Sequence, residues 1–237
     1  MGQDGNLAGR GARQRGAGRE GGAIAEAVRA ALPSPARSGI AGAMMTRDER
    51  FDGALLARTA SVFGKVAIGR GSSLWPNAVI RAECQQVRIG RVTNVQDFAM
   101  IHVGYDVPTV IGDFCSITHH ATVHGATVED ACLVGIGAVL MDGVVLGRGS
   151  IVAGGAVLTE GSVFEPGSIV AGVPAKAIRR RDCSRENRLN AWLYHRNAAA
   201  YARGEHRAWD GPDFEAFKAA LVAELSGDAD LARLAGV

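Results

Sequence analysis

The sequence predicts an all-β fold in which short parallel strands stack as the coils of a prism, with α-helices at the C-terminal end. Aliphatic residues recur every six positions through the middle of the chain, and a small residue usually follows each of them four positions later. Helices repeat every 3.6 residues and strands every two, so neither element alone produces this period. A six-residue period is typical of a parallel β-helix, whose coils bury their aliphatic side chains by stacking on one another.

The repeat extends from Val62 to Val170 and is unbroken from Val128 onward. Since three repeats make one triangular coil, its length predicts about six coils and a prism ~29 Å tall, at ~4.8 Å per stacked strand. The repeat positions are Val62, Ile68, Leu74, Ile80, Ile89, Val95, Ile101, Ile111, Ile117, Val123, Val128, Val134, Leu140, Leu146, Val152, Leu158, Phe164 and Val170.

Glycine and cysteine also follow the repeat. Glycine occupies the position after the aliphatic residue at 69, 90, 112, 135 and 147, where we expect it to tolerate the bend of the coil. Cys84, Cys115 and Cys132 occupy the small fourth position, so we interpret them as core residues. No Cys-x-x-Cys spacing occurs, which argues against a zinc knuckle and a disulfide framework.

The 237 residues predict one folded domain with flanking segments. Residues 1–45 hold Gly, Ala or Arg at 27 of 45 positions, too few apolar residues for a core, so we expect a disordered tail. We expect the β-helix over residues 46–180 and a helical segment over 181–237. Ser184 is a candidate N-cap for a helix over 184–202, and a second amphipathic helix is expected over 213–225.

Charge and hydropathy narrow the range of partners. The net charge is +2, which gives no reason to expect nucleic acid, and no apolar run approaches the ~18 residues that a membrane helix needs. We therefore predict a cytoplasmic protein. An organellar transit peptide within the Arg-rich residues 1–45 is the alternative.

Four of the six histidines cluster in the middle of the repeat, and three of them fall into columns. His102 and His124 each follow a repeat residue, and those repeats are one coil apart, so the two side chains stack on one face. Arg81 occupies the same position one coil earlier. His119 lies two positions after its repeat residue, in a second column with Asp97.

Outward groups from the two columns cannot readily meet on one convex prism, but two prisms packed side by side bring them together. We therefore predict a homotrimer in which one chain supplies His102 and His124, and its neighbour His119, to a metal ion. The same packing brings Arg81 of one chain near Asp97 of the next. Three neutral imidazoles with an open position lower the pKa of zinc-bound water towards ~7. Imidazole also suits Fe²⁺ and Co²⁺. The alternative is that the histidines are ordinary surface groups.

Five separated blocks resemble, in order, the gamma-class carbonic anhydrase family of the hexapeptide-repeat superfamily, over about residues 50–205. The blocks are SLWPNAVIR at 73–81, TNVQD at 93–97, IHV at 101–103, HHATVHG at 119–125 and AGVPAK at 171–176. The resemblance implies a left-handed β-helix, a trimer, and zinc held by His102 and His124 of one subunit and His119 of another.

The resemblance also implies residue roles. Arg81 and Asp97 correspond to the family's interface pair, Gln96 to a residue near the metal-bound water and bicarbonate, and Asn94 to the residue that orients Gln96. Tyr194 is the candidate for a tyrosine that the C-terminal helix offers towards the active site, the alternative being a tyrosine packed in the helix interface.

The chain departs from the family pattern in two blocks and one loop. Arg81-Ala82-Glu83 replaces Arg-Gly-Asp, so the candidate acid, Glu83, is one methylene longer, and Ile117-Thr118-His119 replaces Ile-Gly-His. The loop over 103–109 carries only Asp106 as an acid, and lacks the insertion that supplies a glutamate proton shuttle in the founding archaeal-type members. The chain therefore resembles the short-loop members.

These features predict a zinc-dependent carbonate dehydratase that reversibly hydrates CO₂ to bicarbonate at trimer interfaces. Two alternatives stay open: a metal-stabilised trimer with a structural or assembly role, and a hydrolase of another small ester. A hexapeptide-repeat acyltransferase using acyl-CoA is a further alternative, but such enzymes use a lone general-base histidine and need no three-histidine site.

Overall fold

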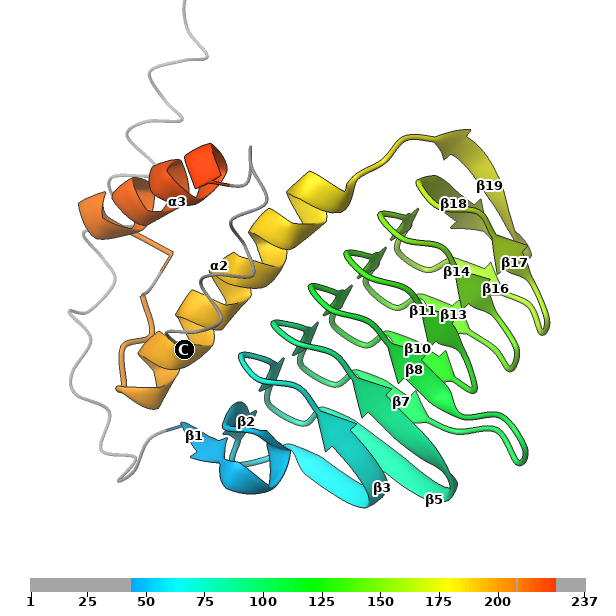
Figure 1. Cartoon of the computed structure of the whole chain (residues 1–237), viewed down its shortest axis with the longest axis horizontal. Helices are drawn as coiled ribbons and strands as arrows, with labels where there is room; N and C mark the ends of the chain where they lie inside the picture. The colour runs from blue at the N-terminus through cyan, green and yellow to red at the C-terminus, as the bar shows by residue number, and fades with distance from the viewer. Residues whose placement is uncertain (1–43, 208, 225–237) are drawn as a thin grey trace, which may run out of the picture. The chain divides into compact units, whose positions relative to one another are not determined.

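A computed structural model describes residues 44–207 and 209–224 of the chain (Figure 1). The tail predicted over residues 1–45 falls almost entirely outside this part, as do the last residues of the C-terminal segment. No helix of the described residues is long and apolar enough to cross a membrane.

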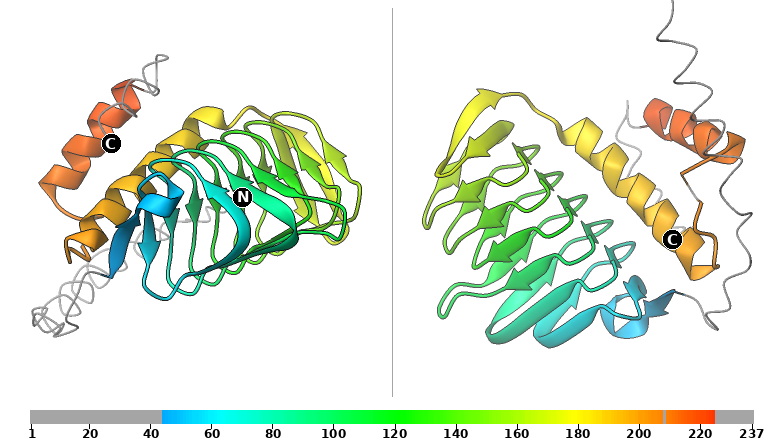
Figure 2. Two further views of the ribbon diagram at one scale, coloured as in Figure 1. Left: turned by 60° about the horizontal axis from the view of Figure 1, so that its bottom comes forward. Right: turned by 180° about the vertical axis from the view of Figure 1, so that it is seen from behind.

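The strands are short and stack into a solenoid of about six turns (Figures 1 and 2). One 3-10 turn, η1 (Glu49–Phe51), precedes the parallel strands. The strands are β1 (Met45–Asp48), β2 (Ala54–Ala57), β3 (Ser61–Ile68), β4 (Ser73–Leu74), β5 (Val79–Ile89), β6 (Asn94–Val95), β7 (Met100–His102), β8 (Thr109–Ile111), β9 (Ser116–Ile117), β10 (Thr122–His124), β11 (Thr127–Val128), β12 (Leu133–Val134), β13 (Val139–Leu140), β14 (Val145–Leu146), β15 (Ile151–Val152), β16 (Val157–Leu158), β17 (Val163–Phe164), β18 (Ser168–Gly172) and β19 (Ala175–Arg180).

Three faces enclose the interior. In the first face, β2, β4, β6, β9, β12, β15 and β18 pair in that order, all in parallel. The second and third faces share the long strands β3 and β5, which run through both. The first part of β5 pairs with β7 and its last part with β8. The coil agrees with the predicted left-handed β-helix of hexapeptide repeats.

The strand register is the one that the repeat predicts. Ile80 pairs with Ile101, Ile101 with Val123, and Val123 with Leu140, so residues three repeats apart lie in adjacent coils. All four side chains are fully buried in the main core cluster, which contains aliphatic residues from every coil. The stacking of coils, as predicted, is therefore what buries the aliphatic positions.

Two of the three repeat cysteines are core residues and one is not. Cys115 and Cys132 are fully buried, and burial raises the pKa of the Cys132 thiol to about 12 and that of Cys115 well above its usual value. Cys84 is exposed, so its predicted core position was wrong. Because β5 continues through the corner between two faces, Ala82 takes the buried place and Cys84 lies on the outside.

The glycines after the aliphatic positions serve a purpose other than the predicted bend. A Cβ on Gly147 would stand 2.7 Å from the carbonyl carbon of Glu165 and 2.8 Å from the oxygen of Phe164, so glycine permits the close approach of the next coil. The left-handed backbone conformation occurs instead three positions after the aliphatic residue, as at Gly155 with φ +69°.

Val92, Phe114 and Ala131 adopt the same left-handed conformation although they carry side chains. These three side chains are buried in one cluster with Trp192 of the first C-terminal helix. Strain of about 1 kcal/mol or more at each position is therefore offset by packing against the helix.

The parallel ladder ends at β18, just before Val173-Pro174, and the chain then returns as the antiparallel strand β19. Helix α2 (Ser184–Ala202) runs along the prism (Figures 1 and 2) and contacts β1, β2, β4, β6 and β9. Ser184 is its first residue rather than its cap, and Asp182 Oδ1 accepts hydrogen bonds from the Ser184 backbone N (2.9 Å) and Oγ (2.5 Å). Helix α3 (Pro212–Glu224) contacts α2.

Candidate metal centre

The candidate centre is built on two stacked histidines of the second face. His102 ends β7 and His124 ends β10, and the parallel register places them directly opposite each other, as the repeat predicts. Because each follows a fully buried residue, Ile101 or Val123, strand alternation points both imidazoles outward. His102 Nδ1 lies 3.0 Å from His124 Nε2, and the ring centroids are 4.9 Å apart.

Two carboxylates flank this pair. Glu83 Oε2 lies 3.0 Å from His102 Nε2, and the same carboxylate forms an ion pair with Arg81. Asp142 Oδ1 lies 2.5 Å from His124 Nδ1. Counting repeats does not indicate Asp142. It lies two positions after Leu140, in the turn after β13, whereas His124 lies one position after Val123, the residue that pairs with Leu140.

His119 lies apart from the stacked pair. It sits in the turn before β10, whereas His124 is the last residue of that strand. Its Nδ1 is 3.0 Å from Asp97 Oδ2, which is the second predicted column. Within residues 44–207 and 209–224 of one chain, no group of three His, Cys, Asp or Glu side chains converges to hold a metal ion. One chain therefore brings together His102 and His124, but not His119.

Gln96 and Asn94 lie beneath the second column and are almost fully buried. Gln96 Nε2 donates to Asn94 Oδ1 (2.9 Å), and Asn94 Nδ2 donates to Ser116 Oγ (2.9 Å). Asn190 of α2 donates from Nδ2 to the same Ser116 oxygen (2.9 Å). Asn94 thus contacts Gln96 as expected, and Ser116 and Asn190 extend the chain of hydrogen bonds that fixes the Gln96 amide.

Tyr194 packs in an aromatic cluster between α2 and the prism. Its ring meets Trp75 edge-on at a centroid distance of 5.5 Å and Trp209 at 5.4 Å. Burial, together with the negative charge of Asp97 and the neighbouring Tyr201, raises the pKa of Tyr194 to about 12. The phenol is therefore neutral at physiological pH, and it lies within the electrostatic range of Asp97.

Exposed apolar side chains accompany both columns. Phe63 pairs in register with Arg81 and is 56% exposed. Beside the other column, Phe98 stacks on His120 at 4.9 Å and is 54% exposed, and Ile136 is 59% exposed. Each column is therefore accompanied by at least one exposed large apolar side chain.

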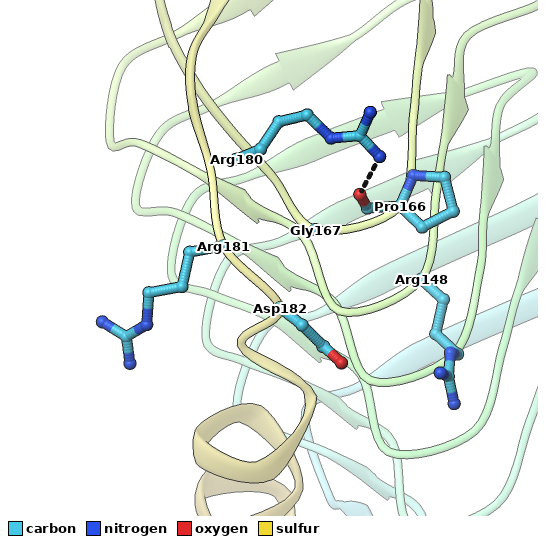
Figure 3. A pocket seen from close by; sticks show the side chains of 6 residues that line it. All are labelled: Arg148, Pro166, Gly167, Arg180, Arg181 and Asp182. Atoms are coloured by element: carbon cyan, nitrogen blue, oxygen red, sulfur yellow. Dashed lines mark hydrogen bonds between the residues drawn. The ribbon is translucent and has the colours of Figure 1, made fainter.

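A pocket of about 320 Å³ lies elsewhere, at the last coils of the prism (Figure 3). Two of its three arginines already have partners: Arg180 Nη2 donates to the Pro166 carbonyl oxygen (3.1 Å), and Arg181 pairs with Glu186. None of the three histidines of the two columns lines it. The pocket residues are Arg148, Pro166, Gly167, Arg180, Arg181 and Asp182.

Comparisons with known proteins agree with the hexapeptide repeat. A model of bacterial transferase hexapeptide repeats (six repeats) matches residues 125–160. Gamma carbonic anhydrase 1, mitochondrial, of Arabidopsis thaliana is 47% identical over 97 residues, which are 38% of this chain and 35% of that protein. A probable carbonic anhydrase of Methanocaldococcus jannaschii is 49% identical over 124 residues, which are 52% of this chain and 78% of that protein. The chain belongs to the gamma carbonic anhydrase family.

Membership of the gamma carbonic anhydrase family confirms the resemblance found in the sequence. The chain spans only about a third of the plant relative's length. A solved structure, a hexapeptide transferase family protein from Anaplasma phagocytophilum, matches with a TM-score of 0.53 and 33% identity, over 65% of this chain and 95% of that one.

Proposed function

We propose that the protein reversibly hydrates CO₂ to bicarbonate at metal centres located between the subunits of a homotrimer. The observation that carries the proposal is the parallel register of β7 and β10, which stacks His102 on His124 with their facing nitrogens 3.0 Å apart. Relatives named as carbonic anhydrases support this activity, and the match with this chain covers 78% of the archaeal protein.

The donor set fits a zinc ion. Nδ1 of His124 contacts the Asp142 carboxylate, and Nδ1 of His119 contacts the Asp97 carboxylate. In each ring, Nε2 is therefore the nitrogen that would bind the metal ion. A histidine that binds a metal through one nitrogen usually donates its other N–H to a carboxylate or carbonyl. His102 and His124 of one subunit and His119 of the next would hold the ion. Zinc supplies a Lewis acid that ionises water near neutral pH, and Fe²⁺ and Co²⁺ accept the same ligands.

The remaining residues bind and orient the reactants. Gln96 presents an amide that is fixed through Asn94, so it can hold bicarbonate in one orientation without reorganising. Glu83 contacts Nε2 of His102, whereas Nδ1 of the same ring faces His124. This half-exposed carboxylate, paired with Arg81, would relay protons between the centre and solvent.

The trimer is supported by the surfaces around the columns. The side carrying Arg81 also carries the exposed Phe63, and the side carrying Asp97 carries the exposed Phe98 and Ile136. Two different surfaces that meet head to tail form a heterologous contact, which closes into a ring when the rotation allows it. We therefore propose that these two sides pack together and bring Arg81 of one subunit to Asp97 of the next.

We propose the cytoplasm as the compartment. The four cysteines are all free thiols, which suits a reducing environment. The plant relatives are named as mitochondrial, so an organellar leader within residues 1–45 is the alternative.

The deciding measurement is stopped-flow CO₂ hydration on anaerobically purified protein, together with metal content per chain. We expect about one metal ion per chain, hydration activity in the wild type, and loss of both in His124→Ala because one of three ligands is removed. His206→Ala, which removes an exposed histidine outside both columns, serves as the matched control and is expected to keep both.

The other outcomes separate the alternatives. One metal ion per chain without hydration would contradict the enzymatic proposal and favour a metal-stabilised assembly or a hydrolase of another ester. A wild-type protein that binds no metal ion under anaerobic conditions would contradict the proposed centre itself.

A further inference from the structure

We infer that Asp142 is a positioning residue that fixes His124 for metal binding, and that Gly104 and Gly125 form a cradle for its carboxylate. The inference rests on the proposed metal centre, but it concerns residues that neither the repeat nor the family resemblance singled out.

Asp142 and the two cradle glycines come from three consecutive coils. Gly104 follows β7, Gly125 follows β10 at once, and Asp142 lies in the turn after β13. Backbone hydrogen bonds tie these coils together at this corner, from Gly125 N to His102 O (3.2 Å) and from Gly143 N to Gly125 O (2.7 Å). The carboxylate is therefore placed by the strand ladder rather than by a mobile loop.

Both glycines leave the space that the carboxylate fills. A Cβ on Gly104 would stand 2.9 Å from Asp142 Oδ2 and 3.0 Å from Oδ1, and a Cβ on Gly125 would overlap Oδ1. Gly125 also has a left-handed backbone with φ +56°, whereas Gly104 does not, so only Gly104 can be replaced without backbone strain. The two glycines thus seat the carboxylate beside His124.

The contact selects one tautomer of His124. An ionised carboxylate only accepts hydrogen bonds, so Asp142 Oδ1, at 2.5 Å from Nδ1, requires the proton on that nitrogen. The Nε2 lone pair is then directed towards His102, which is where a shared ion would lie. A carboxylate on the distal nitrogen also raises the basicity of the ligating nitrogen and fixes the ring orientation.

The tautomer is tested directly in the metal-free protein by long-range ¹H–¹⁵N correlation spectra of the histidine rings. We expect the Nδ1–H form of His124 in the wild type and loss of this preference in Asp142→Ala. Asp142→Asn keeps an acceptor oxygen of the same shape, so we expect it to restore the preference in part. Equal tautomer populations in wild type and Asp142→Ala would overturn the inference.

Metal affinity gives a second readout, by competition with a chelator for Zn²⁺. We expect binding about 10- to 100-fold weaker in Asp142→Ala, and a smaller loss in Asp142→Asn. Gly104→Ala is expected to weaken binding as well, although residue 142 is unchanged, because the new Cβ displaces the carboxylate. Asp106→Ala removes the same charge from an exposed loop and is expected to leave the affinity unchanged. Circular dichroism of each variant establishes that it is folded.

The outcomes distinguish this inference from the proposed function. Zn²⁺ binding in the wild type with unchanged affinity in folded Asp142→Ala would overturn the role of Asp142 and leave the metal centre standing. Absence of Zn²⁺ binding in the wild type would contradict the metal centre, and the tautomer spectra would still decide whether Asp142 fixes the ring.

Discussion

Cys84, Cys115 and Cys132 occupy the same repeat position but differ in their surroundings. The interior thiols of Cys115 and Cys132 have raised pKa values because burial disfavours the thiolate. Cys84 lies on the outer side of β5, and its thiol donates to the Gly104 carbonyl oxygen at 3.4 Å. Since the thiolate is the reactive form, exposure decides which thiols react.

We predict that a thiol reagent such as DTNB modifies Cys84 rapidly in the native protein, and Cys115 and Cys132 only after unfolding. Cys84→Ser should remove the fast phase and leave the total count after denaturation lower by one thiol. Fast native modification of Cys132 would show that the coils open far more readily than their packing indicates.

At the scale of single elements, two kinds of glycine shape each coil. Gly155 has φ +69° and open space around its missing side chain, whereas Gly147 has no positive φ and touches the next coil. The first is required by backbone conformation and the second by close approach. The sequence pattern does not distinguish the two kinds, because both are glycines at fixed repeat positions.

We predict that Gly155→Ala lowers the free energy of unfolding by about 1 kcal/mol, the cost of a left-handed alanine. Gly147→Ala should cost more, about 3 kcal/mol, because its Cβ meets backbone atoms that cannot move without separating two coils. Urea unfolding of the two variants in parallel checks the order. A smaller loss in Gly147→Ala would contradict the close-approach explanation.

Helix α2 carries a pH-sensitive contact with the prism. His195 Nδ1 lies 2.8 Å from the Gly71 carbonyl oxygen, and the ring meets Trp192 edge-on at 5.6 Å. Burial lowers the pKa of His195, and Arg47 adds to this, although the bond to Gly71 opposes it. The folded chain therefore takes up a proton here less readily than the unfolded chain does.

Because the folded pKa lies below the unfolded value of about 6.5, stability is lost as the pH falls through and below 6.5. We predict a decrease in the midpoint of thermal unfolding of the metal-free protein between pH 7.5 and 5.5, at fixed protein concentration. His195→Asn keeps an N–H donor but cannot titrate, so its midpoint should depend less on pH. If the midpoints of the wild type and His195→Asn depend equally on pH, titratable groups other than His195 cause the decrease.

At the scale of the whole molecule, the distribution of histidines over the prism makes the proposed centre a property of the assembly. His119 lies in the turn before β10 and His124 is the last residue of that strand, so the length of the strand separates them within one coil. A second chain would have to supply the missing ligand, and the exposed Phe63, Phe98 and Ile136 mark where it would pack.

We predict that two inactive variants restore activity when they are co-expressed. His119→Ala retains the stacked pair, and the double variant His102→Ala/His124→Ala retains His119, so each mixed trimer of the proposed type regains one intact centre. The check is metal content and CO₂ hydration of the co-expressed protein against each variant alone. If mixed oligomers form but metal binding and CO₂ hydration are not restored, a centre shared between subunits would be contradicted.

The sequence predicted most of the fold because a hexapeptide repeat is local. Counting repeats assigns each aliphatic residue to a face and a coil, and this count predicted the pairing of Ile80 with Ile101 and of Ile101 with Val123. The same counting placed His102 opposite His124 and Asp97 beside His119. It failed at Cys84, because β5 is longer than one repeat and carries the chain around a corner.

The sequence by itself thus determined the coil, its register and the two histidine columns, because a regular backbone turns spacing directly into position. Only the tertiary structure decided which neighbours these side chains meet. It brought Asp142 onto His124 across coils, and Asn190 of α2 onto Ser116 across 74 residues of chain. Such contacts depend on side-chain direction at corners and on the docking of a helix, and neither is encoded in the six-residue period.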